Sequence, residues 1–192
     1  NNISNHAQNL RSDEMKILLV KDDNIDIDLA KSVTILNRIC RTIKFDFSPE
    51  PIKTDANEST INFLKEAISL TEKLQEFQRN SVIYITEKPY ADNFFYHATR
   101  EIMILSFSRW SDYTNLPIEN GLFFFVARML TLNIEGKFRH KQSIGCVYDF
   151  LRYKTDVDAA MKMGYICEQC LERIKKIDNK SGLENIQVDV IE

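Results

Sequence analysis

The pattern of apolar residues predicts an α/β fold of the α+β kind, in which helices pack on a mixed sheet of about four strands. Short, continuous apolar runs typical of buried strands alternate with stretches whose apolar residues recur every three or four positions, as on one face of a helix. The 192 residues are 44% hydrophobic and 28% charged, the composition of an ordinary globular protein. A chain of this length suits one hydrophobic core and is short for two.

The first half of the chain contains two predicted pairs of strand and helix. Residues 15–20 (MKILLV) form the first strand, and the aspartates between 22 and 28 lead into a helix whose apolar face includes Cys40. Those aspartates lack the glycine and the distal glutamate of a calcium loop, so we interpret them as capping groups of the helix. Residues 43–47 alternate as in a half-buried strand, and 61–80 have helical spacing.

Two more buried strands and a long helix are predicted in the second half. The strands lie at 82–85 and 102–107, on either side of a loop rich in aromatic residues at 90–97. The stretch 118–132 is apolar nearly all round, which indicates a helix that is buried on most faces.

The carboxy-terminal region predicts two short helices. Thr155 and Asp158 have the spacing of a capping box for the first of them, and Gly164 is a natural end for it. A last helix is marked by the apolar residues Leu171, Ile174 and Ile177.

We expect one domain from residue 14 to residue 182, with a zinc-binding tail at 136–178. Residues 1–13 are polar and predict a flexible leader, and 183–192 predict an edge strand or a linker to a missing neighbour. The leader lacks the basic-then-apolar pattern of a signal peptide, and no apolar run approaches the ~20 residues of a membrane helix. These features predict a cytoplasmic protein, and the initial asparagine suggests a piece of a longer one.

The strongest chemical signal is a cluster of late cysteines. Cys167 and Cys170 form a CxxC pair at the start of a predicted helix, where the helix dipole favours thiolates and metal binding. A structural zinc ion takes four nitrogen or sulfur ligands, and Cys146 and His140 supply the third and fourth. Reduced structural cysteines and a redox pair are the alternatives, but a redox CxxC usually follows a strand. His97, in the aromatic loop, is more simply a packed or exposed ring.

From about Val82 onward the chain resembles the archaemetzincins, zinc peptidases of the metzincin group with the signature HExxHxxGxxH. In that family five residues separate the third catalytic histidine from a structural cysteine, and here KQSIG separates His140 from Cys146. Twenty residues, against nineteen in the family, then separate Cys146 from the CxxC pair. The ending CEQCLERI also resembles the family's CPxCLxKL.

The chain departs from that family at the catalytic positions. HExxH occurs nowhere, and the segment that should carry it reads IENGLFFFVARMLTLN. Lys141 stands at the place of the first structural cysteine, and Tyr148 at the place of a methionine. The resemblance therefore implies a retained fold and structural zinc in a pseudo-peptidase that has lost its catalytic zinc. His140 is then either a former catalytic position or a replacement for the missing cysteine.

Three functions follow as hypotheses. The first is a non-catalytic zinc-binding module, a regulatory or interaction domain whose partner is another protein or a neighbouring domain. The second is a hydrolase with a site of another kind, using acid and base groups; its candidates are Glu87, Asp92, His97, Asp149 and Lys154.

The third hypothesis is nucleic-acid binding through the mildly basic stretch 136–180. The net charge of the chain is −3, but this stretch contains ten lysines and arginines and only six aspartates and glutamates. The footprint would be Arg139, Lys141, Arg152, Lys154, Lys162, Arg173, Lys175 and Lys176. A solvated face remains the simpler interpretation of this charge.

Overall fold

Five strands form one sheet in the order β2-β1-β3-β5-β4. This computed structural model describes residues 15–40, 43–52, 59–77, 81–99, 101–132, 140 and 142–173. The four strands β1, β2, β3 and β5 are parallel to one another, and β4 is antiparallel to β5. Their bounds are β1 Met15–Lys21, β2 Ile43–Phe47, β3 Ser81–Thr86, β4 Tyr96–Ala98 and β5 Ile102–Ser106.

The prediction of about four strands missed β4. This strand has three residues, all half-buried, and lies inside the segment 90–97 that was predicted as an aromatic loop. Its partners are in β5, with Tyr96 opposite Leu105 and Ala98 opposite Met103. A strand this short does not display an alternating pattern long enough to detect in sequence.

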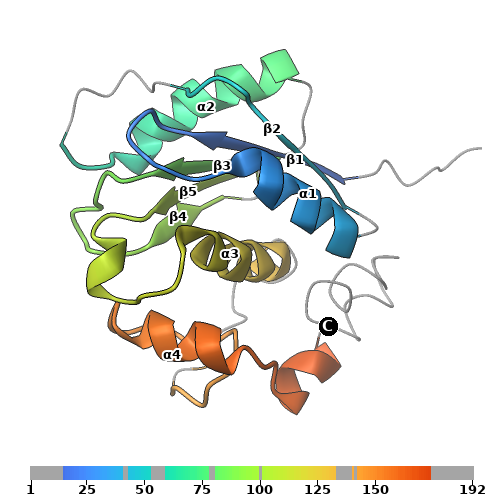
Figure 1. Cartoon of the computed structure of the whole chain (residues 1–192), viewed down its shortest axis with the longest axis vertical. Helices are drawn as coiled ribbons and strands as arrows, with labels where there is room; N and C mark the ends of the chain where they lie inside the picture. The colour runs from blue at the N-terminus through green and yellow to red at the C-terminus, as the bar shows by residue number, and fades with distance from the viewer. Residues whose placement is uncertain are drawn as a thin grey trace, which may run out of the picture.

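Helices cover both faces of the sheet (Figure 1). One face packs against α1 (Leu29–Ile39) and α3 (Ile118–Leu132). The opposite face packs against α2 (Phe63–Phe77). Alternate residues of each strand face opposite sides, so Leu19 belongs to the first core and Leu18 to the second. Both predicted helix–strand pairs and the mixed α/β architecture are therefore confirmed.

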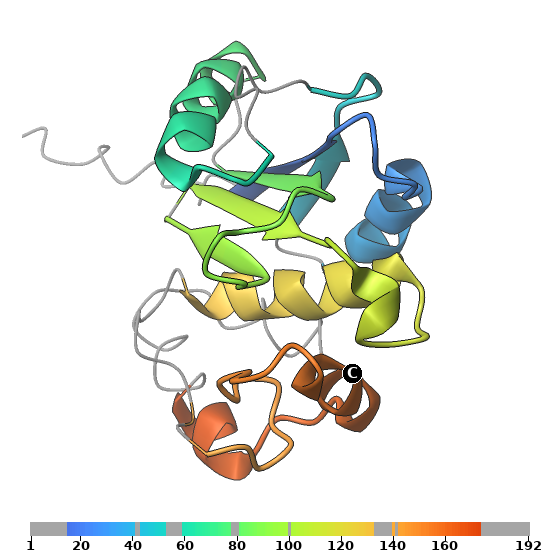
Figure 2. The same cartoon turned by 90° about the vertical axis from the view of Figure 1, so that its left-hand side faces the viewer.

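The carboxy-terminal segment packs against the outer side of α3, away from the sheet (Figure 2). It contains α4 (Asp156–Met163) and a further helical turn at 168–173. Val157 and Ile166 from this segment share the core with Leu122 and Met129 of α3. As predicted, α3 is buried on most faces. Among the described residues no helix is long and apolar enough to cross a membrane.

Only part of the predicted capping is found. Asp28 caps α1, because its Oδ1 accepts a hydrogen bond of 2.9 Å from the amide of Lys31. Asp22, however, is buried and accepts hydrogen bonds of 2.8 Å from the amide of Asn24 and from Thr86 Oγ1. The interpretation of Asp22 as a helix cap was therefore wrong: this carboxylate joins the ends of two neighbouring strands.

The predicted capping box at α4 is also absent. Thr155 precedes the helix but makes no capping hydrogen bond with its side chain. Asp158 instead accepts bonds from Thr114 Oγ1 at 2.6 Å and from Lys162 Nζ at 2.8 Å, so its carboxylate is engaged elsewhere. Gly164 ends the helix with φ +53°, as predicted. Residues 1–13 and 183–192, for which a leader and an edge strand or linker were predicted, lie outside the described residues.

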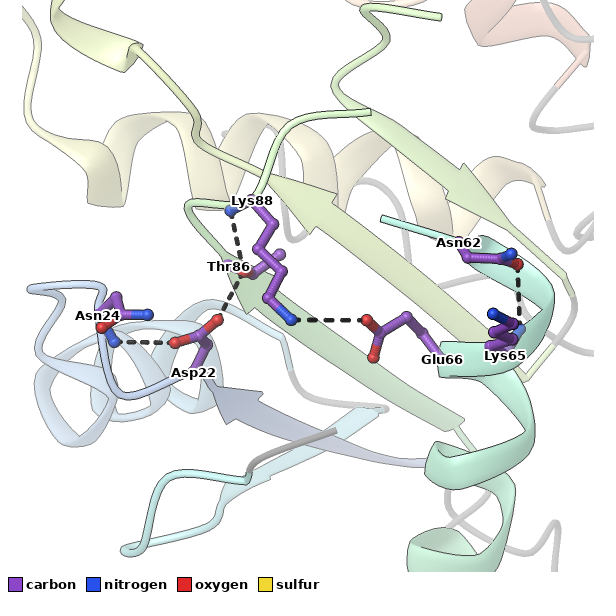
Figure 3. A network of polar contacts seen from close by, with 7 residues as sticks. All are labelled: Asp22, Asn24, Asn62, Lys65, Glu66, Thr86 and Lys88. Atoms are coloured by element: carbon purple, nitrogen blue, oxygen red, sulfur yellow. Dashed lines mark hydrogen bonds and ion pairs between the residues drawn. The ribbon is translucent and has the colours of Figure 1, made fainter. Parts of the chain in front are cut away.

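A polar network ties α2 to the carboxyl ends of β1 and β3 (Figure 3). Thr86 lies at the end of β3, and its hydroxyl group donates a hydrogen bond to Asp22 Oδ2. The same hydroxyl oxygen accepts a 3.1 Å hydrogen bond from the amide of Lys88. Lys88 Nζ lies 3.8 Å from Glu66 Oε1 of α2. The Glu66 side chain is fully buried, and neither carboxylate oxygen has a hydrogen-bond partner among the described residues. Its charge is therefore balanced mainly by the ammonium group of Lys88.

We expect Lys88→Met to destabilise the protein by about 2 kcal/mol, because it leaves the buried Glu66 carboxylate without its nearest cation. Glu66→Gln removes the charge itself and should have a smaller effect. The double variant should be more stable than Lys88→Met alone. Urea denaturation measures all three, and equal losses for the two single variants would contradict this interpretation.

Candidate metal centre

Three stretches of the carboxy-terminal segment bring the predicted metal ligands together. His140 is held beside residues 148–150, because its amide donates to Tyr148 O at 3.1 Å and its carbonyl accepts from the amide of Phe150 at 3.0 Å. Cys146 pairs with Tyr165 in an isolated bridge. Cys167 directly precedes the helical turn at 168–173, which carries Cys170. The predicted helix at the CxxC pair is thus confirmed as far as residue 173, and Ile174 and Ile177 lie outside the described residues.

The four donor atoms of His140, Cys146, Cys167 and Cys170 all lie within 4.8 Å of one another. His140 Nε2 is 3.2 Å from Cys167 Sγ and 3.0 Å from Cys170 Sγ. In a tetrahedral zinc site, Zn–S bonds of about 2.3 Å and Zn–N bonds of about 2.0 Å place the donor atoms roughly 3.6 to 3.8 Å apart. The observed cluster therefore fits a zinc ion after small movements of its side chains, as a Cys3His set.

Burial favours the neutral form of the cysteine thiols, so the thiolate form of the cluster needs a compensating positive charge. Cys146 and Cys170 are 0% and 3% exposed, and burial is the main cause that raises the pKa of both thiols. The neighbouring thiols also raise the pKa of Cys170, by hydrogen bonding and by charge repulsion. Three thiolates this close together need a positive charge among them, and a bound divalent cation supplies one.

Asp149 shapes the loop that carries Cys146. Its Oδ2 accepts hydrogen bonds from the amides of Ile144 at 2.7 Å, Gly145 at 2.6 Å and Cys146 at 3.1 Å. The chain can turn this tightly because Gly145 adopts φ +85°, and a β-carbon there would collide with the Met163 side chain. The Asp149 residue is 1% exposed. A buried carboxylate thus fixes the backbone on which Cys146 stands.

Arg128 connects this loop to the main core. It lies on α3, is 5% exposed, and donates from Nη1 to the carbonyl oxygens of Val147 and of Asp149. Its guanidinium also lies over the Phe124 ring, 5.4 Å from the centroid. The loop that carries Cys146 is therefore held by α3 from one side and by Asp149 from within.

Sequence reasoning missed the roles of Arg128 and Asp149. An arginine inside the apolar run FFFVARML indicates that its guanidinium has a hydrogen-bonding partner in the folded protein. The partners are backbone carbonyl groups, and the sequence does not identify which ones. The structure places the His140 ring against Cys167 and Cys170, so this histidine lies with the cysteines.

The residues of the alternative hydrolase hypothesis fall into separate places. His97 Nε2 lies 2.8 Å from Asp92 Oδ2, and both line an open pocket of about 410 Å³, from whose lining Glu87 is absent. Lys154 packs over the rings of Phe95 and Tyr113, and burial lowers its pKa. Asp149 lies in the Cys146 loop, where its Oδ2 accepts from three backbone amides.

Of the predicted basic footprint, half lies outside the described residues. These are Arg139, Lys141, Lys175 and Lys176. Of the other four, Lys154 is buried and Lys162 is paired with Asp158 at 2.8 Å. Arg152 lies over the ring of Tyr153.

Comparison with known proteins finds likeness in structure alone. No protein-family model and no curated protein sequence matches the chain. The zinc-dependent peptidase from Methanocorpusculum labreanum (strain Z) superposes with a TM-score of 0.54 at 16% identity, covering 82% of this chain and 99% of that one. The archaemetzincin from Methanopyrus kandleri gives a TM-score of 0.56 at 17% identity, covering 88% and 98%. The chain therefore shares the fold of archaemetzincin-like zinc peptidases, and within that fold it carries a histidine and three cysteines that could hold a zinc ion.

Proposed function

We propose that this chain is a zinc-binding module without peptidase activity, which serves as a regulatory or interaction domain of a larger protein. The observation that carries the proposal is the convergence of His140, Cys146, Cys167 and Cys170, whose donor atoms lie within 4.8 Å of one another. Four protein ligands close the coordination sphere of zinc and leave no open position for water or substrate. The ion would then have a structural role, which is to fasten the carboxy-terminal segment to α3.

The histidines of the chain support the loss of peptidase chemistry. A metzincin-type site needs three histidines on zinc and a glutamate that activates water. This chain has three histidines in all: His97 lies beside the sheet edge, His140 lies among the cysteines, and His6 is outside the described residues. The helix α3, on which the resemblance places HExxH, contains no histidine, and its one glutamate is Glu119 in the first turn.

An interaction role is favoured by the surface of the metal segment. Large apolar side chains are exposed there, including Tyr153 at 60%, Met163 at 56% and Ile144 at 46%. Such side chains gain free energy when a partner removes them from water. We infer a protein partner or a neighbouring domain, in the cytoplasm, where cysteines stay reduced for zinc.

Metal analysis and a peptidase assay test the proposal together. Purified protein should contain one zinc ion per chain, and it should not hydrolyse peptides at any zinc concentration. A zinc-dependent peptidase activity that is lost in His140→Ala would overturn the non-catalytic assignment. The absence of zinc from protein purified without chelators, and after incubation with zinc, would overturn the metal assignment.

A hydrolase remains the second candidate, because His97 and Asp92 form a hydrogen-bonded pair at an open pocket. Such a pair can take up a proton from water or a hydroxyl group. Esterase and phosphatase substrates provide the test, with Asp92→Asn as the inactive variant. Nucleic-acid binding is less favoured, since Lys154 is buried and Lys162 is already paired.

A further inference from the structure

A second potential ligand site lies beside the sheet edge, at the amino-terminal end of α2. Its pocket, of about 410 Å³, is lined by the rings of Phe63, Tyr90 and His97 and by the carboxylate of Asp92. The backbone holds its two walls together, since the Ile61 amide donates to Pro89 O at 2.8 Å. None of these residues takes part in the cysteine cluster, so the site is independent of the proposed zinc ion.

The aromatic rings of the pocket are fixed in position. Tyr90 is 6% exposed, and its hydroxyl donates to Ile104 O of β5 at 2.9 Å. The His97 ring packs edge-on against Tyr90, with 4.8 Å between centroids, and lies 5.9 Å from Phe63. Rings held in this way present their π faces and edges to a ligand without a large loss of side-chain entropy on binding.

Asp92 supplies a carboxylate beside these rings. Asp92 has a side chain that is 45% exposed, and its carboxylate accepts from His97 at 2.8 Å and from the amide of Phe94 at 3.2 Å. A carboxylate can accept about four hydrogen bonds, so these two leave capacity for a ligand. The pKa of Tyr90 is raised, first by burial and then by the charges of Asp92 and Glu66. Among the residues that line the pocket, Asp92 carries the one carboxylate, whereas Glu66 and its partner Lys88 lie outside the lining.

We propose that this pocket binds an organic cation, an alkylammonium or guanidinium group, between its aromatic rings and the Asp92 carboxylate. Aromatic faces attract cations through their quadrupole, and the attraction increases where water is partly excluded. The carboxylate supplies the opposite charge at the pocket wall. The cation would come either from a free small molecule or from a lysine or arginine side chain of a peptide.

Titration with defined probes, followed by NMR on the full chain, tests the proposal. Choline, methylguanidinium and blocked arginine serve as cations, and 3,3-dimethyl-1-butanol is the uncharged counterpart of choline. We expect the cations to shift the ring signals of His97, and the alcohol to leave them unchanged. Tighter binding of blocked arginine than of methylguanidinium would indicate a peptide side chain as the source, and the reverse a free small molecule.

Matched variants locate the site. Asp92→Asn should weaken cation binding at least ten-fold, and Phe63→Leu should weaken it while the fold is retained. Asp112→Asn is the control, because Asp112 is also 45% exposed and paired with a cationic side chain, Arg109, outside the pocket. Unchanged His97 signals in 20 mM of every cation, equal binding of the alcohol, or equal affinities of the Asp92→Asn and Asp112→Asn variants would each overturn the proposal. Because the zinc content is measured separately, failure here leaves the proposed zinc module unaffected.

Discussion

Chelation of zinc should unfold the carboxy-terminal segment of the protein in one cooperative step. The free energy of zinc binding to structural sites is about 10–16 kcal/mol in small zinc domains, which equals or exceeds the stability of a typical domain. In this chain, residues 142–173 contain only short helices, and the segment depends on the cluster of His140, Cys146, Cys167 and Cys170 to bring its stretches together. Without the ion, the buried thiols would become protonated and the cluster would lose its central attraction.

The effect should reach beyond the segment, because Val157, Ile166 and Cys170 belong to the same core as α3 and the sheet. We expect chelation to lower the thermal midpoint by more than about 10 °C, from the size of the lost free energy. Amide hydrogen exchange should show that protection is lost first at 142–173 and least in β1 and β3. Protein that keeps its thermal midpoint and its exchange protection after complete zinc removal would contradict a structural role for the ion.

Substitutions separate the ligands from ordinary buried cysteines. Cys146→Ser should reduce the zinc content and reproduce the effect of chelation. Cys40→Ser is the matched control, since Cys40 is also buried, at 3% exposure, but lies in the core at the end of α1, outside the cluster. It should lower stability modestly and leave one zinc ion per chain. If both variants lost zinc equally, the loss would reflect general destabilisation rather than ligation.

The four residues of the cysteine cluster were accessible to sequence reasoning because they lie close together along the chain. Cys167 and Cys170 share one helical turn, and Cys146 and His140 precede them by a spacing that a known family also shows. The supporting residues were not accessible in this way. The role of Asp149 depends on three successive amides that turn toward one carboxylate, and that of Arg128 on carbonyl groups from another segment.

The elements of the fold also differ in how well the sequence predicted them. The parallel strands follow mainly from short apolar runs and α1 to α3 from helical spacing, whereas β4 has only three residues, which pair with β5. Asp22 was assigned to the helix that follows it in sequence, but its hydrogen bond goes to Thr86, 64 residues away. Short elements and long-range polar contacts are thus fixed by tertiary structure, and local pattern gives little information about them.

The second large effect should come from Asp149→Asn, a nearly isosteric change that removes one charge. All three amides of Ile144, Gly145 and Cys146 donate to Oδ2, and a neutral amide oxygen in that place would bind them more weakly than the carboxylate does. The NH2 group would take the place of Oδ1, which is buried and has no hydrogen-bond partner among the described residues. Hydrogen bonds to a buried charged group contribute about 1.5–3 kcal/mol each, so we expect a loss of roughly 3 kcal/mol in the free energy of unfolding. Because Asp149 positions Cys146, zinc affinity should also fall, by about 10- to 100-fold.

Asp158→Asn provides the control in the same segment. Asp158 is an aspartate with two side-chain partners, Thr114 and Lys162, neither of which lies in the Cys146 loop, and its side chain is 30% exposed. Its loss should reduce stability by less than about 1 kcal/mol, as for partly exposed ion pairs, and should leave zinc affinity unchanged. Competition with a chromogenic chelator measures the affinity of each variant. Asp149→Asn could instead destabilise the fold but bind zinc as tightly as the parent protein. That result would mean that the carboxylate stabilises only the loop, and that the ion itself positions its ligands.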